Sequence, residues 1–266
     1  EQGICRLMSI NLLKRMESSV HSFLLTVKRI YDYLHDTSHV IDDFIATGAN
    51  NLNEMPDLSS EADEFDYDDQ NTDFFNVGKK VKIDLRDMDY ISWKREMDDD
   101  IENLQLLILM IEDITPEYDF KLNELIRIIR EKAAAPINPG NKKILIFTAF
   151  SDTAEYLYEN ISDMALKELG LHTALVTGSV DGKTTIPKFK PDMNHVLACF
   201  SPKSKDRDVL YPKDKTDIDI LIATDCISEG QNLQDCDYCV NYDIHWNPVR
   251  IIQRFGRIDR IGRKNA

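Results

Sequence analysis

Two kinds of hydrophobic spacing divide the chain. Residues 4–46 and 86–134 carry apolar side chains every three or four positions, which predicts amphipathic helices. From residue 142 onward, short runs of apolar residues alternate with helical stretches, which predicts buried strands joined by helices. The segment PINPGN at 136–141 lies between these patterns, and its prolines and glycine end any helix there. We therefore expect a helical extension over 1–135 and an α/β domain over 136–266.

The helical extension is expected to contain three helices. The first covers 4–46 with an interruption near Asp36, and the second covers 86–113. In the third, Thr115 is the expected cap, Pro116 lies in the first turn, and the helix continues to about residue 134.

Residues 50–78 between the first two helices are predicted to form a mobile acidic loop. Nine acidic residues lie between Glu54 and Asp73, and no Lys or Arg occurs from Ile30 to Gly78. Their spacing does not fit a calcium-binding loop. The net charge of −15 is concentrated in this half, since residues 1–135 hold 15 Lys and Arg against 29 Asp and Glu. Residues 136–266 hold 17 against 18, so charge does not exclude a polyanionic partner for the second half.

The α/β domain is expected to contain a parallel sheet covered by helices on both faces. Helices are predicted from Ser151 or Asp152 to Gly170, near 194–200, and from Pro248 onward. The predicted strands lie within KILIFTAF, LHTALVTG, DIDILIAT and YCVNYD.

The last helix has two chemically different faces. Its apolar residues are Ile251, Ile252, Phe255 and Ile258. Its arginines are Arg250, Arg254, Arg257 and Arg260. We expect the apolar face to pack and the arginine face to present planar guanidinium groups, which suit phosphate oxygens. An ordinary solvated face remains the alternative.

The five cysteines and the bulk composition limit the class of protein. An odd number of cysteines without framework spacing is typical of a reducing compartment, so we expect a cytoplasmic protein. Cys236 and Cys239 form a C-x-x-C with Cys226 and His245 nearby, but no second pair completes a zinc site. We therefore expect no bound metal. No apolar run approaches the roughly 20 residues that span a bilayer, so we expect no membrane partner.

The segment TGSVDGKT at 177–184 has some features of a phosphate-binding P-loop. Three residues separate Gly178 from Gly182, whereas the P-loop requires four. Pro187 would also disrupt the helix that must follow. An independent P-loop NTPase is therefore the less favoured alternative.

Several ordered motifs in the second half resemble one protein family. QRFGRIDRIGR resembles the arginine-finger motif Q-x-x-G-R-x-x-R of superfamily-two helicases and translocases. The form SEGQNLQ, followed by a D-x-x-WNP segment and GRIDRIG, is most similar to the Swi/Snf-type branch, particularly bacterial members related to the RNA-polymerase-recycling ATPase. KKILIFTAFSDTAEYL and HVLACFSPKSK also resemble segments of the second RecA-like lobe, and LLKRMESSVHSF resembles a segment preceding it.

The resemblance implies an α/β fold with a RecA-like parallel sheet sandwiched by helices. This is the P-loop NTPase-type helicase C-terminal lobe, here preceded by an all-helical extension with the acidic loop. Walker A and B motifs belong to the first lobe of such motors, so we expect a fragment of a larger protein. Glu17, Ser18 and Ser19 fall in the resembling upstream segment, although we expect them to be simply exposed within a helix.

The resemblance also implies roles for individual residues. Arg257 and Arg260 would reach the γ-phosphate of ATP, with Gln253 assisting. The loop on the nucleotide side would be ordered by Glu229, Gly230 and Asn232. Contacts to nucleic-acid phosphates would come from Thr224, Ser228, Thr177 and Gly178. Gly230 has the simpler alternative role of allowing a tight turn.

The implied partners are the first RecA-like lobe of the same parent protein and nucleic acid, which in the Swi/Snf type is duplex DNA. ATP with Mg²⁺ would be held mainly by that first lobe. We expect this chain alone to bind ATP weakly and not to hydrolyse it. The alternative from another functional class is a non-enzymatic interaction module, in which the acidic helical half docks a basic partner.

Overall fold

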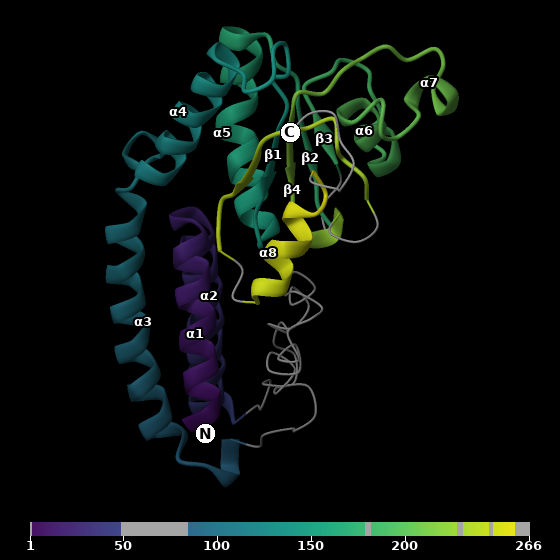
Figure 1. Ribbon diagram of the computed structural model, residues 1–266. Helices are drawn as coiled ribbons and strands as arrows, with labels where there is room; N and C mark the ends of the chain where they lie inside the picture. The colour runs from purple at the N-terminus through teal and green to yellow at the C-terminus, as the bar shows by residue number, and fades with distance from the viewer. Residues whose placement is uncertain (1, 49–84, 179–181, 228–230, 245–246, 259–266) are drawn as a thin grey trace. The chain divides into compact units, whose positions relative to one another are not determined.

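A computed structural model describes residues 2–48, 85–178, 182–227, 231–244 and 247–258. The chain divides into two compact units, Glu1–Thr115 and Pro116–Ala266 (Figure 1). The acidic loop expected at 50–78 lies outside the described residues. Within the described part of the chain, no helix has the length and apolar character needed to cross a bilayer.

The first unit is helical, as expected. It contains α1 (Gln2–Ser18), α2 (Val20–Thr47), the short 3-10 turn η4 (Leu85–Asp87) and α3 (Tyr90–Glu112). Helices α2 and α3 pack through a core that includes Ile41, Phe44, Leu85 and Met97.

The break in the first predicted helix lies at Ser19, so its expected position near Asp36 was wrong. Ser19 adopts an extended backbone, and its Oγ accepts a hydrogen bond from the Ser22 N–H at 3.0 Å. It is therefore the N-cap of α2. Ser18 and Ser19 are both buried, contrary to the expectation of solvent exposure, and Arg15 donates to the Ser22 hydroxyl at 3.2 Å beside them.

The second unit contains a five-stranded sheet in the order β3-β2-β4-β1-β5 (Figure 1). The three pairings among β1, β2, β4 and β5 are parallel, and β3 pairs with β2 in the antiparallel direction. The strands are β1 (Ile144–Phe147), β2 (Thr173–Val176), β3 (Lys183–Thr184), β4 (Ile220–Ala223) and β5 (Cys239–Asn241). Only β3 was not anticipated among these strands.

Helices cover both faces of this sheet (Figure 1). One face carries Ile144, Ile146 and Ile220 and packs against α4 (Phe120–Ala134) and α5 (Ser151–Leu169). The opposite face carries Leu145, Phe147 and Leu221 and packs against α6 (Met193–Phe200). Alternate residues of each strand point to opposite faces, so the continuous apolar runs supply both layers. The remaining elements are η5 (Pro116–Tyr118), α7 (Arg207–Leu210), η6 (Asp225–Ile227) and α8 (Pro248–Phe255).

Along the chain, the boundary between the two units lies between Thr115 and Pro116, whereas the sequence placed it at 135/136. The reason is that α4 packs on the sheet, with Leu122, Leu125 and Ile129 buried in the core of the second unit. The cap of α4 also differs from the expectation. Asp119, and not Thr115, accepts from the Leu122 N–H at 3.0 Å.

The N-terminus of α5 differs in a similar way. Its N-cap is Phe150, which makes no side-chain capping bond, while Ser151 and Asp152 are already inside the helix and buried. Its C-terminus agrees with the expectation, because Gly170 ends the helix at a φ of 67°, a left-handed conformation that favours glycine.

Candidate nucleotide and nucleic-acid edge

The carboxyl ends of β1, β2, β4 and β5 bring the predicted motifs to one edge of the sheet. Thr224 follows β4, and its N–H donates to the Val176 carbonyl at the end of β2 at 3.3 Å. Thr177 and Gly178 follow directly, and a Cβ built on Gly178 would lie 3.5 Å from the Cβ of Cys226. Ligands of parallel α/β sheets bind at this type of edge. Three of the four residues expected to contact nucleic acid therefore lie together; Ser228 lies outside the described residues.

The loop that follows η6 meets the segment that follows α8. The Leu233 N–H donates to the Arg257 carbonyl at 3.0 Å, which joins the neighbour of Asn232 to the first predicted arginine finger. Asn232 and Gln253 each carry a buried side-chain oxygen that accepts no hydrogen bond from the described residues. The Leu233–Arg257 hydrogen bond therefore brings the backbone of Arg257 next to the neighbour of Asn232, while Gln253 lies on α8, four residues before Arg257. Glu229, Gly230 and Arg260 lie outside the described residues.

Helix α8 does not pack by the faces that were expected, although Ile258, just after the helix, is buried in the core as expected. The Arg254 side chain is fully buried and Arg250 is also buried, whereas Ile252 and Phe255 are 71% and 54% exposed. The helix begins as expected, with Asn247 capping it and Pro248 in the first turn. It ends at Phe255, so Arg257 lies in the following turn and not on the helix.

Arg254 is buried because it completes a hydrogen-bond network at the strand ends. Its Nε and Nη2 donate to the two carboxylate oxygens of Asp225 at 2.7 and 2.6 Å. Its Nη1 lies 3.3 Å from Asn241 Oδ1, at the end of β5. Burial alone would lower the pKa of Arg254, but the hydrogen bonds and charge of Asp225 outweigh it and raise the pKa. A bidentate hydrogen-bonded pair with a carboxylate keeps a buried guanidinium charged.

Asp243 continues this network to β1. Its carboxylate accepts from the Thr148 hydroxyl at 2.6 Å and from the Ala149 N–H at 2.8 Å. Sequence reasoning missed Arg254, Asp225, Asp243 and Thr148 as a structural unit. The available signal was that Thr148, Asp225 and Asp243 each stand just after the end of a strand, and parallel strands bring these ends to one edge.

The GKT segment does not form a phosphate-binding loop. Lys183 and Thr184 form β3, which pairs with β2, so a strand occupies the place where a P-loop helix would begin. The Lys183 Nζ lies 2.6 Å from Glu155 on α5. Gly182 is needed because a Cβ there would lie 2.6 Å from the Pro191 carbonyl oxygen. These observations give the glycine and the lysine structural roles.

The C-x-x-C cysteines are shielded thiols. Burial raises the pKa of Cys236 to about 12 and that of Cys239 to about 11. Cys236 Sγ lies 3.2 Å from the Tyr238 carbonyl oxygen, within its own turn. Of the other two residues considered for a zinc site, Cys226 is exposed and its Sγ lies 3.8 Å from the Val176 carbonyl oxygen, and His245 lies outside the described residues.

Comparison with known proteins identifies the family. The family model for the helicase conserved C-terminal domain matches residues 121–262, more than half of the chain. The uncharacterized ATP-dependent helicase YqhH of Bacillus subtilis is 53% identical over 47 residues, which are 18% of this chain and 8% of that protein. The putative ATP-dependent DNA helicase fml2 of Schizosaccharomyces pombe is 26% identical over 142 residues, which are 53% of this chain and 16% of that protein.

A structural similarity accompanies these matches. The C-terminal part of the Fun30 ATPase domain has a TM-score of 0.35 and 20% identity, over 64% of this chain and 50% of that one. The chain spans less than a fifth of either curated relative named above. The family match begins at residue 121, next to the start of α4, in accord with the packing of that helix on the sheet. The chain belongs to the helicase conserved C-terminal domain family.

Proposed function

We propose that this chain is the second motor lobe of an ATP-dependent DNA helicase or translocase of the Swi/Snf type, in the bacterial branch related to the RNA-polymerase-recycling ATPase. The observation that carries the proposal is the hydrogen bond between Leu233 and Arg257, which holds the two motif segments together. Family membership supports a helicase lobe, and the motif forms SEGQNLQ and GRIDRIG favour the Swi/Snf branch.

In this proposal, Arg257 and Arg260 reach the γ-phosphate of an ATP molecule held by the first lobe, and Gln253 assists them. Charge accumulates on the phosphoryl oxygens in the transition state, and a positioned arginine accelerates such transfers by about 10³ to 10⁵. Glu229, Gly230 and Asn232 order the loop beside them. The buried oxygens of Asn232 and Gln253 support a site completed by groups beyond the described residues.

In this proposal the Mg²⁺ of ATP is held mainly by the first lobe. Asp225 and Asp243 are the carboxylates at the strand ends that the structure describes, and both are engaged. Asp225 binds Arg254, and Asp243 binds Thr148 and the Ala149 N–H. These residues do not fit a magnesium site, since a divalent ion would have to displace their partners.

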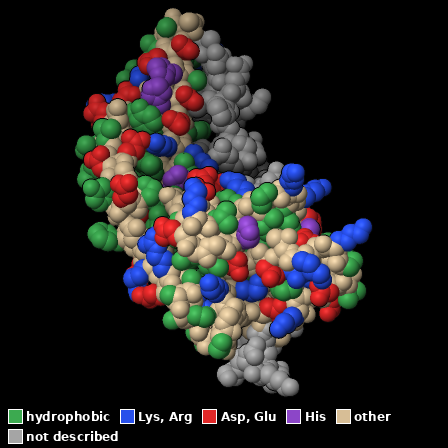
Figure 2. Space-filling model, turned by 90° about the horizontal axis from the view of Figure 1, so that it is seen from above, with side chains coloured by type: hydrophobic (Ala, Val, Ile, Leu, Met, Phe, Trp, Pro, Cys, Tyr) green, Lys and Arg blue, Asp and Glu red, His purple; other side chains and the backbone are tan. Residues whose placement is uncertain are grey.

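Thr224, Ser228, Thr177 and Gly178 supply contacts to the backbone of duplex DNA. Hydroxyls and backbone N–H groups bind phosphate without reading sequence, as a translocating motor requires. On the face shown in Figure 2, Lys and Arg side chains are interspersed with Asp and Glu. Cytoplasmic localisation belongs to the same proposal.

The experiment compares ATP turnover by this chain alone and by its parent protein, each with and without duplex DNA. The proposal expects DNA-stimulated turnover by the parent protein and none by the chain, because a split site needs both lobes. DNA-stimulated turnover by the chain alone would refute it.

A non-enzymatic interaction module remains the second candidate. One observation favours it: Leu106, Leu109 and Met110 on α3 are each more than half exposed within the first unit. This candidate is preferred if changing both Arg257 and Arg260 to Ala leaves the ATPase activity of the parent protein intact.

A further inference from the structure

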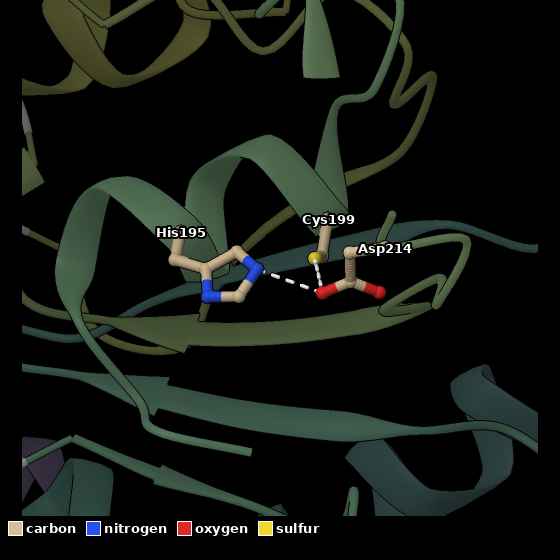
Figure 3. Close-up of side chains that lie close together, drawn as sticks. All are labelled: His195, Cys199 and Asp214. Atoms are coloured by element: carbon tan, nitrogen blue, oxygen red, sulfur yellow. Dashed lines mark hydrogen bonds and ion pairs between the residues drawn. The ribbon is translucent and has the colours of Figure 1, made fainter. Parts of the chain in front are cut away.

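Away from the sheet edge that carries the predicted motifs, three side chains with metal-binding chemistry converge between α6 and the loop that leads to β4. His195 and Cys199 lie four residues apart on α6, so both point from one face of the helix. Asp214 comes from the following loop (Figure 3). One donor atom from each residue lies within 4.8 Å of the other two, and no other such trio occurs among the described residues.

The distances are close to those of a bound ion. His195 Nε2 lies 2.7 Å and Cys199 Sγ 3.7 Å from the same Asp214 oxygen, Oδ2 (Figure 3). Zinc binds nitrogen, oxygen and sulfur at about 2.0–2.3 Å, so donors on one tetrahedral ion lie roughly 3.3–3.6 Å apart. Admitting an ion therefore requires His195 and Asp214 to separate by less than about 1 Å.

The surrounding residues hold these donors in place. The His195 ring is stacked between Phe189 and Tyr211, with centroid distances of 4.4 and 4.2 Å. The other Asp214 oxygen, Oδ1, accepts from the Thr216 N–H at 2.8 Å. Partners that orient ligand side chains in this way are a regular part of protein metal sites.

The site also has an entry path. Cys199 is fully buried, but the side chains of His195 and Asp214 retain 22% and 20% of their exposure. An ion can therefore arrive from solvent and keep water as a fourth ligand. On binding, the metal–sulfur bond replaces the thiol S–H bond, and the proton leaves to solvent.

We propose that His195, Cys199 and Asp214 bind one divalent ion of the zinc class, which fastens α6 to the loop entering β4. Imidazole, thiolate and carboxylate together suit Zn²⁺ better than Mg²⁺ or Ca²⁺, which prefer oxygen ligands. The site is distinct from the sheet edge that carries the predicted motifs and does not depend on the proposed motor function. It also replaces the expectation of no bound metal, which considered only the C-x-x-C segment.

The test uses the full 266-residue chain and two probes, Zn²⁺ and Co²⁺. We expect one equivalent of tightly bound Zn²⁺ by atomic emission, and a thiolate-to-cobalt charge-transfer absorption with Co²⁺. Cys199→Ala should abolish that absorption, and His195→Gln and Asp214→Asn should weaken binding of both ions at least tenfold, the scale on which ligand-shell changes act. Zn²⁺ should raise the unfolding temperature of the wild-type chain and not that of His195→Gln.

The matched control is the double variant Cys236→Ser with Cys239→Ser, which removes the C-x-x-C pair and should leave ion binding unchanged. The proposal is overturned if the wild-type chain binds neither ion stoichiometrically. It is equally overturned if the absorption persists in Cys199→Ala and disappears in the double variant. Stoichiometric ion binding is measured first on the unaltered chain, so its absence counts against the proposal whether or not the variants fold.

Discussion

Arg254 and Arg257 are three residues apart and have different surroundings. Arg254 is fully buried and makes a bidentate salt bridge with Asp225. Arg257 lies in the turn after α8, beside the loop of Asn232. The sequence predicted one arginine face because charge spacing does not reveal which guanidinium binds a carboxylate inside the fold. The carboxylate partner lies 29 residues away in the chain.

Removing the buried guanidinium should destabilise the second unit. Arg254→Ala leaves the Asp225 carboxylate, whose side chain is only 12% exposed, without its partner, so we expect the free energy of unfolding to fall by about 3–5 kcal/mol. Urea denaturation followed by circular dichroism measures the change. Arg127→Ala is the control, because Arg127 is an exposed arginine in surface ion pairs and its loss should have little effect. Equal stability of the two variants would contradict the structural role of Arg254.

Lys183 separates the strand assignment from the P-loop alternative. Its side chain pairs with Glu155 and Glu159 on α5. We therefore expect Lys183→Ala to leave the affinity of this chain for ATP unchanged, as measured by equilibrium dialysis. A tight ATP complex in the wild-type chain that is lost in the variant would contradict this assignment and restore the P-loop alternative.

At the scale of elements, hydrophobic spacing predicted every parallel strand and most helices, because buried strands of an α/β sheet have continuous apolar runs. It did not predict β3, since two residues carry no periodic signal, or α7, which has four. Caps were the least predictable feature. Asp119 caps α4 and its second carboxylate oxygen also accepts from the Tyr156 hydroxyl at 3.0 Å, a contact that no local pattern contains.

The cap of α4 can be tested against the one that the sequence suggested. Asp119→Ala removes the cap and leaves the buried Tyr156 hydroxyl without its acceptor, so we expect a loss of about 2 kcal/mol in the free energy of unfolding. Thr115→Ala should have little effect. Thermal and urea unfolding of the two variants compare them directly, and the reverse order of stability would show that α4 begins as first predicted.

At the scale of the whole molecule, the division at Thr115 and Pro116 has a consequence for fragments. A fragment covering 116–266 should fold cooperatively, because it keeps Leu122, Leu125 and Ile129 in the core of the sheet. A fragment covering 136–266, the boundary suggested by the PINPGN segment, exposes that core and should be aggregated or poorly folded. Circular dichroism melts of both fragments measure this. Equal cooperativity would contradict the assignment of α4 to the second unit.

The α/β fold and its family could be predicted from sequence because strand runs and ordered motifs are local features. The packing of α8 could not, since it depends on which distant carboxylates reach Arg254. The same limit applies to the trio of His195, Cys199 and Asp214, whose third member comes from a loop. In each case, the missing information is a contact between segments far apart in the chain.

In the function proposed above, this lobe supplies arginines to a nucleotide held by another lobe. The most direct measurement is the DNA-stimulated ATP turnover of the parent protein carrying Arg257→Ala and Arg260→Ala, with the unfolding temperature measured in parallel. We expect turnover to fall by a factor of at least about 10³, with folding and DNA binding retained. Turnover within a few-fold of the unaltered protein, in a variant that remains folded, would contradict it.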